Sequence, residues 1–121
     1  MNKRILIADD HSYVRKALRA RLESEDGLIV CGEAEDGLDA LQKVNSLHPD
    51  LVVMDIRMPR MNGIDASRRL KQLNPKTPVI LCTLYRDVMT KSDLNSLGVE
   101  AIVSKTDDLK LLAGHVHRLL A

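Results

Sequence analysis

The chain has 121 residues, of which 45% are hydrophobic and 29% are charged, the balance of one soluble globular domain. Its formal net charge of +1 gives no electrostatic argument for binding to nucleic acid or to a membrane surface. The apolar runs are too short for a transmembrane helix or a secretory signal peptide. Cys31 and Cys82 have no partner at metal-site spacing, and we interpret both as buried, reduced thiols. We therefore expect a single domain over residues 1–121 and a cytoplasmic location.

Five short apolar runs predict the strands of a parallel sheet. Each is rich in Val, Ile or Leu, with apolar residues in succession rather than in alternation. Such runs are typical of strands that are buried on both faces, as in a parallel sheet covered by helices. In chain order, the predicted strands are Ile5–Ala8, Leu28–Cys31, Leu51–Met54, Val79–Cys82 and Ala101–Val103.

The stretches that follow these strands carry apolar residues three or four positions apart, which predicts a helix in each. His48-Pro49, Asn74-Pro75 and Gly98 mark the ends of the second, third and fourth helices. Five alternating β/α units predict an open, doubly wound parallel α/β sheet with helices on both faces, since a closed barrel needs about twice as many residues. The apolar stripes are Val14, Ala17, Leu18 and Leu22, then Leu38, Leu41 and Val44, then Ala66, Leu70 and Leu73, then Val88, Leu94 and Leu97, and finally Leu109, Leu112, Val116, Leu119 and Leu120.

Polar side chains follow four of the predicted strands directly. Ligands of such sheets bind outside the carboxyl ends of the strands, so we expect these groups at one edge. Carboxylates gathered there repel each other unless a cation joins them, and all-oxygen ligands favour Mg²⁺. A carboxylate beside that metal can attack a phosphoryl group, whose oxygens a lysine and a hydroxyl would stabilise. The residues predict a phosphoryl-accepting site composed of Asp9, Asp10, Asp55, Thr83, Ser104 and Lys105.

Each of these residues also has an ordinary structural interpretation. A lone aspartate after a strand usually caps a helix or forms a turn, and turn-forming residues follow Asp55. Thr83 alone is more often a plain strand residue, and Lys105 a solvated charge. The functional interpretation therefore depends on their shared position, since all of them come directly after an apolar run.

Four segments resemble the bacterial response-regulator receiver domain of two-component systems. The resemblance covers essentially the whole chain in the right order, and the pattern Met-Asp-x-x-Met-Pro-x-x-x-Gly is highly specific. It implies a flavodoxin-like sheet with strand order 2-1-3-4-5. It also implies that a sensor histidine kinase phosphorylates the aspartate after the third strand in the presence of Mg²⁺. The segments are Ile7–His11, Val52–Gly63, Pro78–Thr83 and Ser104–Lys105.

Carried over to this sequence, the resemblance makes Asp55 the phosphoacceptor. Mg²⁺ would be bound by the carboxylates of Asp10 and Asp55 and by the backbone carbonyl of Arg57, with Asp9 assisting through water. Arg57 and Tyr85 occupy family positions that tune how fast the acyl phosphate is lost. We therefore expect substitution of either residue to alter the lifetime of the phosphoryl group.

The resemblance also assigns residues to the phosphoryl group and to the switch. Thr83 would place its hydroxyl on the phosphoryl group, and Lys105 would pair with a phosphoryl oxygen. Pro59 and Gly63 would shape the loop after the acceptor. Many receivers carry Tyr or Phe three residues before the lysine, where this chain has Ile102. An aliphatic side chain cannot make the inward turn of a ring, so the usual aromatic coupling to a distant surface is missing.

Three other functions remain open at this stage. An aspartyl-phosphate phosphatase usually has a second Asp two residues after its nucleophile, where this chain has Arg57, and would need room for a cap domain. A flavin-binding module would need aromatic or hydroxyl-rich loops, and the chain has neither Phe nor Trp. A pseudo-receiver would act only as an interaction domain. The leading hypothesis is a receiver that is not an enzyme beyond self-phosphorylation and autodephosphorylation.

The segments Met54–Pro59 and Thr83–Asp87 are similar to receivers that precede a helix-turn-helix domain. We therefore expect a transcription regulator that binds DNA only through a domain not in this chain. The chain fits either a complete single-domain regulator or the receiver part of a longer protein. The expected partners are a sensor histidine kinase and, on phosphorylation, a second copy of the chain, with no membrane contact.

Other polar residues carry weaker signals. His11 borders the acidic pair or simply leads into the first helix, and Asp36-Gly37 predicts a turn into the second. His115 and His117 are two positions apart on a helix and point to different faces, which excludes a metal pair. Two basic stretches are interpreted as solvated surface, with a partner-docking face as the alternative: Arg15, Lys16, Arg19 and Arg21, and Arg68, Arg69 and Lys71.

Overall fold

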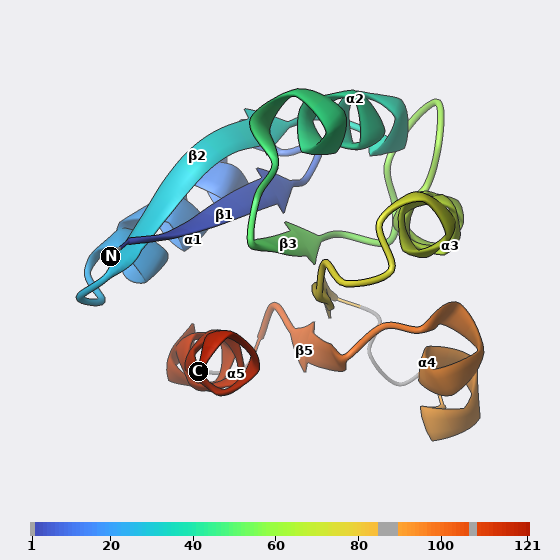
Figure 1. The fold of residues 1–121 in the computed structure, drawn as a ribbon. Helices are drawn as coiled ribbons and strands as arrows, with labels where there is room; N and C mark the ends of the chain where they lie inside the picture. Colours follow the sequence, from blue (N-terminus) through green and yellow to red (C-terminus); the bar gives the residue numbers. More distant parts are fainter. Residues whose placement is uncertain (1, 85–89, 107–108) are drawn as a thin grey trace.

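The computed structural model describes residues 2–84, 90–106 and 109–121, and these form alternating strands and helices (Figure 1). The strands are β1 (Lys3–Ala8), β2 (Leu28–Ala34), β3 (Leu51–Met54), β4 (Val79–Thr83) and β5 (Ala101–Ser104). The helices are α1 (Ser12–Glu23), α2 (Gly37–Leu47), α3 (Gly63–Leu73), α4 (Lys91–Leu97) and α5 (Leu109–Leu120). Among the described residues, no helix is long and apolar enough to cross a membrane.

The strands pair in parallel in the order β2-β1-β3-β4-β5, which is the order that the resemblance implies. Helices α1 and α5 cover one face of the sheet, and α2, α3 and α4 cover the other (Figure 1). The sequence-based prediction of a doubly wound parallel sheet with helices on both faces is therefore confirmed.

The sheet separates two hydrophobic clusters, because successive side chains of a strand point to opposite faces. Leu6 and Ala8 of β1 pack with the cluster under α2, α3 and α4, whereas Ile5 and Ile7 pack with the cluster under α1 and α5. All four side chains are at most 1% exposed. Burial on both faces explains why the strands are continuous apolar runs.

The helix ends fall where the sequence predicts them. The side chain of Asp36 accepts a hydrogen bond from the first turn of α2, which then ends at His48 in the left-handed region, with φ of 50°. Helix α3 ends at Asn74, and α4 ends at Gly98, where φ is 74°. Val88, which we assigned to the fourth apolar stripe, lies outside the described residues.

Strand β2 is longer than predicted. Its pairing with β1 skips Cys31, since Val30 faces Ile5 and Gly32 faces Leu6, so Cys31 forms a β-bulge. The sequence after the bulge contains glycine and glutamate, which have low strand propensity. The apolar run therefore stops at the bulge, although the strand continues beyond it.

Both cysteines are free thiols. Cys82 is buried, as predicted, whereas Cys31 at the bulge is only partly buried. Burial raises the pKa of the Cys31 thiol, so this side chain stays protonated at neutral pH. Cys31 therefore lacks the low pKa that marks a reactive thiolate.

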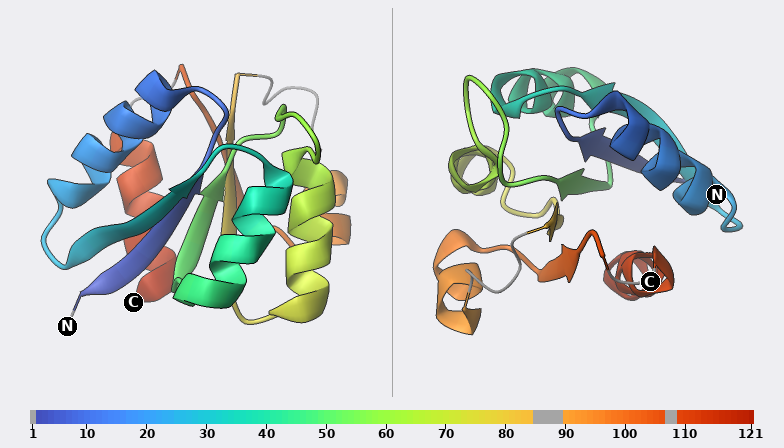
Figure 2. Two further views of the ribbon diagram at one scale, coloured as in Figure 1. Left: turned by 90° about the horizontal axis from the view of Figure 1, so that it is seen from above. Right: turned by 180° about the vertical axis from the view of Figure 1, so that it is seen from behind.

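Parallel pairing brings the carboxyl ends of the strands to one edge of the sheet. Both ends of the chain lie at the opposite edge, at the bottom of the left view in Figure 2. The loops that follow β1, β3, β4 and β5 therefore begin close together, and the predicted site residues lie in them or directly before them.

Candidate functional site

An acidic cluster lies at the carboxyl edge of the sheet. Asp9, Asp10 and His11 follow β1, and Asp55 follows β3, the neighbouring strand. One ligand atom from each of these residues lies within 4.8 Å of the corresponding atoms of the others. Asp9 and Asp55 are buried, whereas Asp10 and His11 are exposed. Two carboxylates of the cluster are therefore buried in the protein, and its other two side chains are accessible to solvent.

Asp9 is held at several atoms at once. Its amide donates to the Ala34 carbonyl at 3.0 Å, and its Oδ1 accepts from the amide of His11 at 2.9 Å. Its Oδ2 lies 2.6 Å from the ammonium group of Lys105. The backbone carbonyl of Asp9 accepts from Nη1 of Arg15 at 2.7 Å. This side chain, 1% exposed, is thus a fixed part of the site.

Asp55 begins the loop after β3 and is buried, with 5% of its surface exposed. Its amide donates to the Ala8 carbonyl at 2.9 Å, its Oδ1 accepts from the amide of Ile56 at 2.8 Å, and its Oδ2 lies 3.1 Å from Nζ of Lys105. Burial, followed by the charge of Asp9, raises the pKa of Asp55, although Lys105 acts in the opposite direction. Ionised Asp55 therefore lacks full compensation within the protein.

Lys105 joins the two buried carboxylates. Burial alone would lower its pKa, but its hydrogen bonds and charge interactions with Asp9 and Asp55 outweigh burial and raise it. Its amide donates to the carbonyl of Thr83 at 2.8 Å, which ties the end of β5 to the end of β4. Thr83 itself is 1% exposed. Lys105 is therefore a fully charged group at a fixed place.

The charges of the cluster fit a divalent cation. With His11 neutral, the carboxylates of Asp9, Asp10 and Asp55 exceed the ammonium group of Lys105 by two negative charges. Oxygen donors of this kind suit a hard cation such as Mg²⁺. The residues present therefore fit the metal that the resemblance implies.

The loop after Asp55 is packed tightly against it. The amide of Gly63 donates to the Ile56 carbonyl at 2.7 Å, and a Cβ atom at Gly63 would lie 1.8 Å from the carbonyl oxygen of Asp55. Arg60 adopts a left-handed conformation, with φ of 63°, and its guanidinium group contacts Oδ2 of Asp36 at 2.5 and 2.7 Å. Glycine at position 63 is thus a steric requirement of the loop.

The structure brings Asp9, Asp10, Asp55 and Lys105 together, and Thr83 ends the adjacent strand. Their roles in phosphoryl transfer, and that of the Arg57 carbonyl, remain predictions. Tyr85 lies outside the described residues. Ile102 is half-buried beside the cluster under α2, α3 and α4. Of the other positions in the segments that resemble the family, Pro59 lies in the loop after β3, Gly63 begins α3 and Ser104 ends β5.

The structure also tests the predictions for the histidines and for Arg15. His11 lies both in the cluster, with Nδ1 3.1 Å from Asp10, and at the start of α1, so both interpretations of it hold. His117 contacts Glu25 and His115 contacts Arg118, which agrees with different faces. Arg15 is not solvated surface, because its side chain is only 17% exposed and points into the loop of Asp9. No sequence pattern indicated that contact.

Residues 5–117 match the family model described as the response regulator receiver domain, and the chain belongs to this family. It is thus a receiver, a domain whose role in two-component systems is to accept a phosphoryl group as a signal. The resemblance seen in the sequence is confirmed.

Several known proteins are similar to the chain. Protein YhcZ of Bacillus subtilis, named an uncharacterized transcriptional regulatory protein, is 46% identical over 69% of the chain and 39% of its own length. A protein-glutamate methylesterase/protein-glutamine glutaminase of Pyrococcus abyssi is 38% identical over 82% of the chain and 27% of its own length. The chain thus spans well under half of these two relatives.

A solved structure agrees in both sequence and fold. The response regulator TrrA of Thermotoga maritima, in complex with Mg(2+)-BeF, is 32% identical with a TM-score of 0.86. The match covers 97% of this chain and 98% of that one.

Proposed function

We propose that Asp55 accepts the phosphoryl group from a phosphohistidine of a sensor histidine kinase. A carboxylate oxygen of Asp55 forms a bond to phosphorus, and the phosphorus–nitrogen bond breaks with its electron pair left on the imidazole. The observation that carries this proposal is the placement of the Asp55 carboxylate, buried among Asp9, Asp10 and Lys105. Its raised pKa shows the uncompensated charge that a cation would relieve.

The metal site would be formed by the carboxylates of Asp10 and Asp55 and the backbone carbonyl of Arg57, with Asp9 acting through water. Bound Mg²⁺ supplies positive charge that offsets the repulsion between a carboxylate and phosphoryl oxygens. The TrrA structure in complex with Mg(2+)-BeF supports this choice of ion. Asp9 holds Lys105 directly, so it keeps the ammonium group in place at the same time.

Lys105 and Thr83 would recognise the phosphoryl group. The Lys105 ammonium group, 3.1 Å from Asp55, is placed to form a charge-assisted hydrogen bond to a phosphoryl oxygen. Thr83, at the end of β4, would hydrogen-bond another. Because both bind the phosphorylated form better, they shift the equilibrium between two conformations of the domain.

We propose that the phosphodonor approaches the site beside Lys105. A hollow of ≈ 580 Å³ opens there, with His11, Tyr13, Leu84 and Leu109 among its lining residues. Tyr13 and Leu84 are mainly exposed, at 70% and 59%. The hollow would receive part of a protein donor next to Lys105 and His11, beside the acidic cluster.

Intact mass after incubation with acetyl phosphate and Mg²⁺ tests the proposal. We expect one added phosphoryl group that requires the metal, is removed by hydroxylamine and is lost in Asp55→Asn. Asp65→Asn is the matched control, because Asp65 is an exposed aspartate at the start of α3. An unmodified wild-type chain that also fails with a histidine kinase would favour the pseudo-receiver, and labelling that persists in Asp55→Asn would move the acceptor elsewhere.

The output that we propose is control of transcription, supported by the 46% identity to YhcZ. DNA would be bound only by a domain outside these 121 residues, and phosphorylation would favour a homodimer. The receiver, residues 1–121, would work in the cytoplasm as an acceptor and not as an enzyme. The similarity to a Pyrococcus abyssi methylesterase covers 27% of that protein, which leaves an enzymatic output in a longer protein as the alternative.

A further inference from the structure

Arg15 of α1 connects the acidic cluster to the edge strand of the sheet. Its Nη1 donates to the backbone carbonyl of Asp9 at 2.7 Å, and its Nε donates to Oε1 of Glu33 at 2.9 Å. The Arg15 side chain is 17% exposed and that of Glu33 is 29% exposed. One guanidinium group therefore spans from α1 to both β2 and the loop after β1.

Glu33 holds Arg15 firmly in this position. Its second carboxylate oxygen, Oε2, accepts from Nε of Arg19 at 2.9 Å, so two arginines one helical turn apart share one acceptor. Burial alone would raise the pKa of Glu33, but the hydrogen bonds from Arg15 and Arg19 lower it. Glu33 stays ionised at neutral pH, and the Arg15 contact is charge-assisted.

The contact with the Asp9 carbonyl restrains the backbone that leads into Asp10. The carbonyl of Asp9 and the amide of Asp10 belong to one planar peptide group, so a hydrogen bond to the carbonyl also fixes the plane that leads into Asp10. Asp10 is exposed, whereas Asp9 is held by Ala34, His11 and Lys105. Arg15 thus restrains the turn from the buried to the exposed carboxylate from the α1 side, together with the hydrogen bond from the His11 amide to Oδ1 of Asp9.

We propose that Arg15 is a positioning residue for the metal site, which orients the Asp9–Asp10 peptide so that the Asp10 carboxylate is preorganised for Mg²⁺. The inference rests on the proposed function, because it assumes that Asp10 binds the metal. Partners that orient metal ligands typically change metal affinity by about 10–100-fold when they are removed.

Arg19 provides a matched control. It lies on the same helix, has the same side chain and binds the same carboxylate, but within the described part of the chain it contacts Glu23 and Glu33 and not Asp9. The comparison of Arg15→Met with Arg19→Met therefore isolates the contact to the Asp9 carbonyl from the ion pair with Glu33.

Titration calorimetry with MgCl₂ alone, without a phosphodonor, measures the effect. We expect the Kd for Mg²⁺ to rise about tenfold in Arg15→Met and by less than about twofold in Arg19→Met. In ¹⁵N NMR spectra of the metal-free protein, the Asp10 amide should shift in Arg15→Met and stay unchanged in Arg19→Met. Thermal unfolding in EDTA compares the stability of the two variants.

Three results would overturn the proposal: equal Mg²⁺ affinity in wild type and Arg15→Met, an equal loss in both variants, or an unshifted Asp10 amide. If Arg15→Met does not fold, Arg15→Lys decides, because one ammonium group cannot replace both guanidinium contacts and affinity should still fall. A wild-type chain that binds no Mg²⁺ would overturn the proposed metal site together with this inference, whereas wild-type binding with an unaffected variant would overturn the inference alone.

Discussion

Lys105 contacts two buried carboxylates for which we propose different roles. It lies 2.6 Å from Asp9 and 3.1 Å from Asp55, and both contacts raise its pKa. The shorter contact anchors the ammonium group to a carboxylate that is fixed by the backbone around it. If Asp55 is phosphorylated as proposed, the ammonium group would turn toward a phosphoryl oxygen while Asp9 still holds it.

Among the glycines, Gly63 leaves the least room for a side chain. A Cβ atom there would lie 1.8 Å from the Asp55 carbonyl oxygen, so Gly63→Ala must displace the loop that begins at Asp55, the proposed acceptor. We expect a loss of about 3 kcal/mol in the free energy of unfolding, measured by urea denaturation. Phosphorylation by acetyl phosphate should fall as well, because the Asp55 backbone moves.

Gly114→Ala is the control for this substitution. Gly114 lies in α5, and a Cβ atom there meets nothing within 4 Å. Alanine in a helix should raise the free energy of unfolding by about 0.5–1 kcal/mol. Equal stability of the two variants would contradict the close approach at Gly63.

The sequence was informative for residues whose position along a strand decides their role. Asp9, Asp55 and Lys105 follow apolar runs directly, and parallel pairing alone brings such residues to one edge. The contact of Arg15 with the Asp9 carbonyl depends instead on the distance between a helix and a loop. The left-handed backbone of Arg60 likewise depends on tertiary contacts, because that conformation is unusual for a residue other than glycine.

At the level of elements, two loops at the site edge are joined to each other. Asp36, 2% exposed, caps α2 and binds the guanidinium group of Arg60 in the loop after β3. The amide of Gly37 donates to the Met61 carbonyl at 2.9 Å in the same region. The start of α2 and the loop after the acceptor therefore form one unit.

This connection predicts a pH-dependent stability. Burial alone would raise the pKa of Asp36, but hydrogen bonds from the backbone of α2 and from Arg60 lower it. A carboxyl with a lowered folded pKa stabilises the fold above its unfolded pKa of about 3.9, and this contribution is lost as pH falls through the folded value. Asp36→Asn should cost about 1–3 kcal/mol at pH 7. The difference from wild type should shrink below about pH 4, as urea denaturation over pH would measure.

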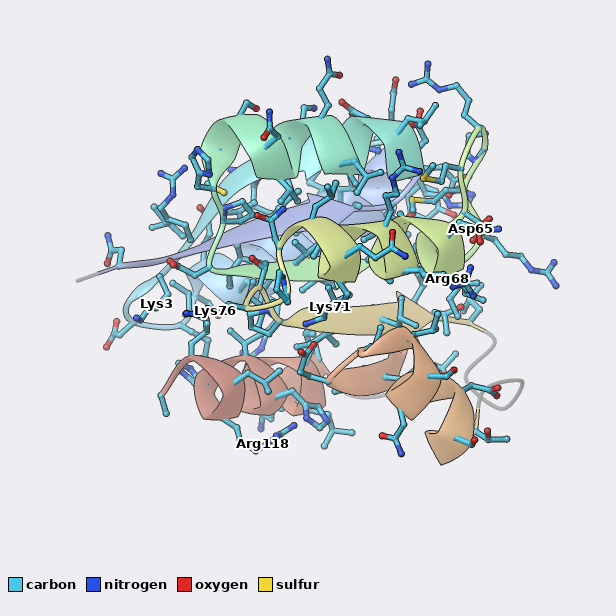
Figure 3. All side chains as sticks on the ribbon, turned by 45° about the vertical axis from the view of Figure 1, so that its right-hand side comes forward. Lys3, Asp65, Arg68, Lys71, Lys76 and Arg118 are labelled. Carbon is cyan, nitrogen blue, oxygen red and sulfur yellow. The ribbon has the colours of Figure 1, made fainter. Side chains whose placement is uncertain are left out.

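Asp65→Asn gives the surface comparison for this experiment. Asp65 pairs with Arg68 at 3.0 Å on the outside of α3, where both side chains are 55% exposed (Figure 3). Exposed pairs of this kind contribute about 0–1 kcal/mol. A pH-independent difference between Asp36→Asn and wild type would show that the charge of Asp36 has no part in the connection.

At the level of the whole molecule, two apolar clusters stabilise the sheet, while carboxylates that repel one another lie at its carboxyl edge. The raised pKa of Asp55 means that its ionisation opposes folding near neutral pH. The domain therefore tolerates charge repulsion at one edge because burial on both faces of the sheet compensates for it. A cation at this edge would add to stability.

Mg²⁺ should accordingly stabilise the fold through binding. At a concentration about 100 times the Kd, linkage predicts a gain of about 2.7 kcal/mol in the free energy of unfolding. In Asp10→Asn the gain should be much smaller, and Asp55→Asn should be more stable than wild type without metal, because the repulsion with Asp9 is removed. Thermal unfolding with and without MgCl₂ measures both effects, and an equal gain in all three proteins would refute site-specific binding.

The single-residue bulge at Cys31 shifts, by one position, which side chains of β2 point to each face of the sheet. With the bulge, Glu33 faces Ile7 and lies on the side of α1, whereas Ala34 faces Ala8 on the side of α2. If Cys31 paired with Leu6 in a regular ladder instead, Glu33 would lie opposite Ala8 and its charge would turn into the α2 side of the core. The bulge therefore decides whether an arginine on α1 finds its acceptor. A receiver whose second strand has the same length but no bulge would present a different residue to α1 behind the same acidic pair.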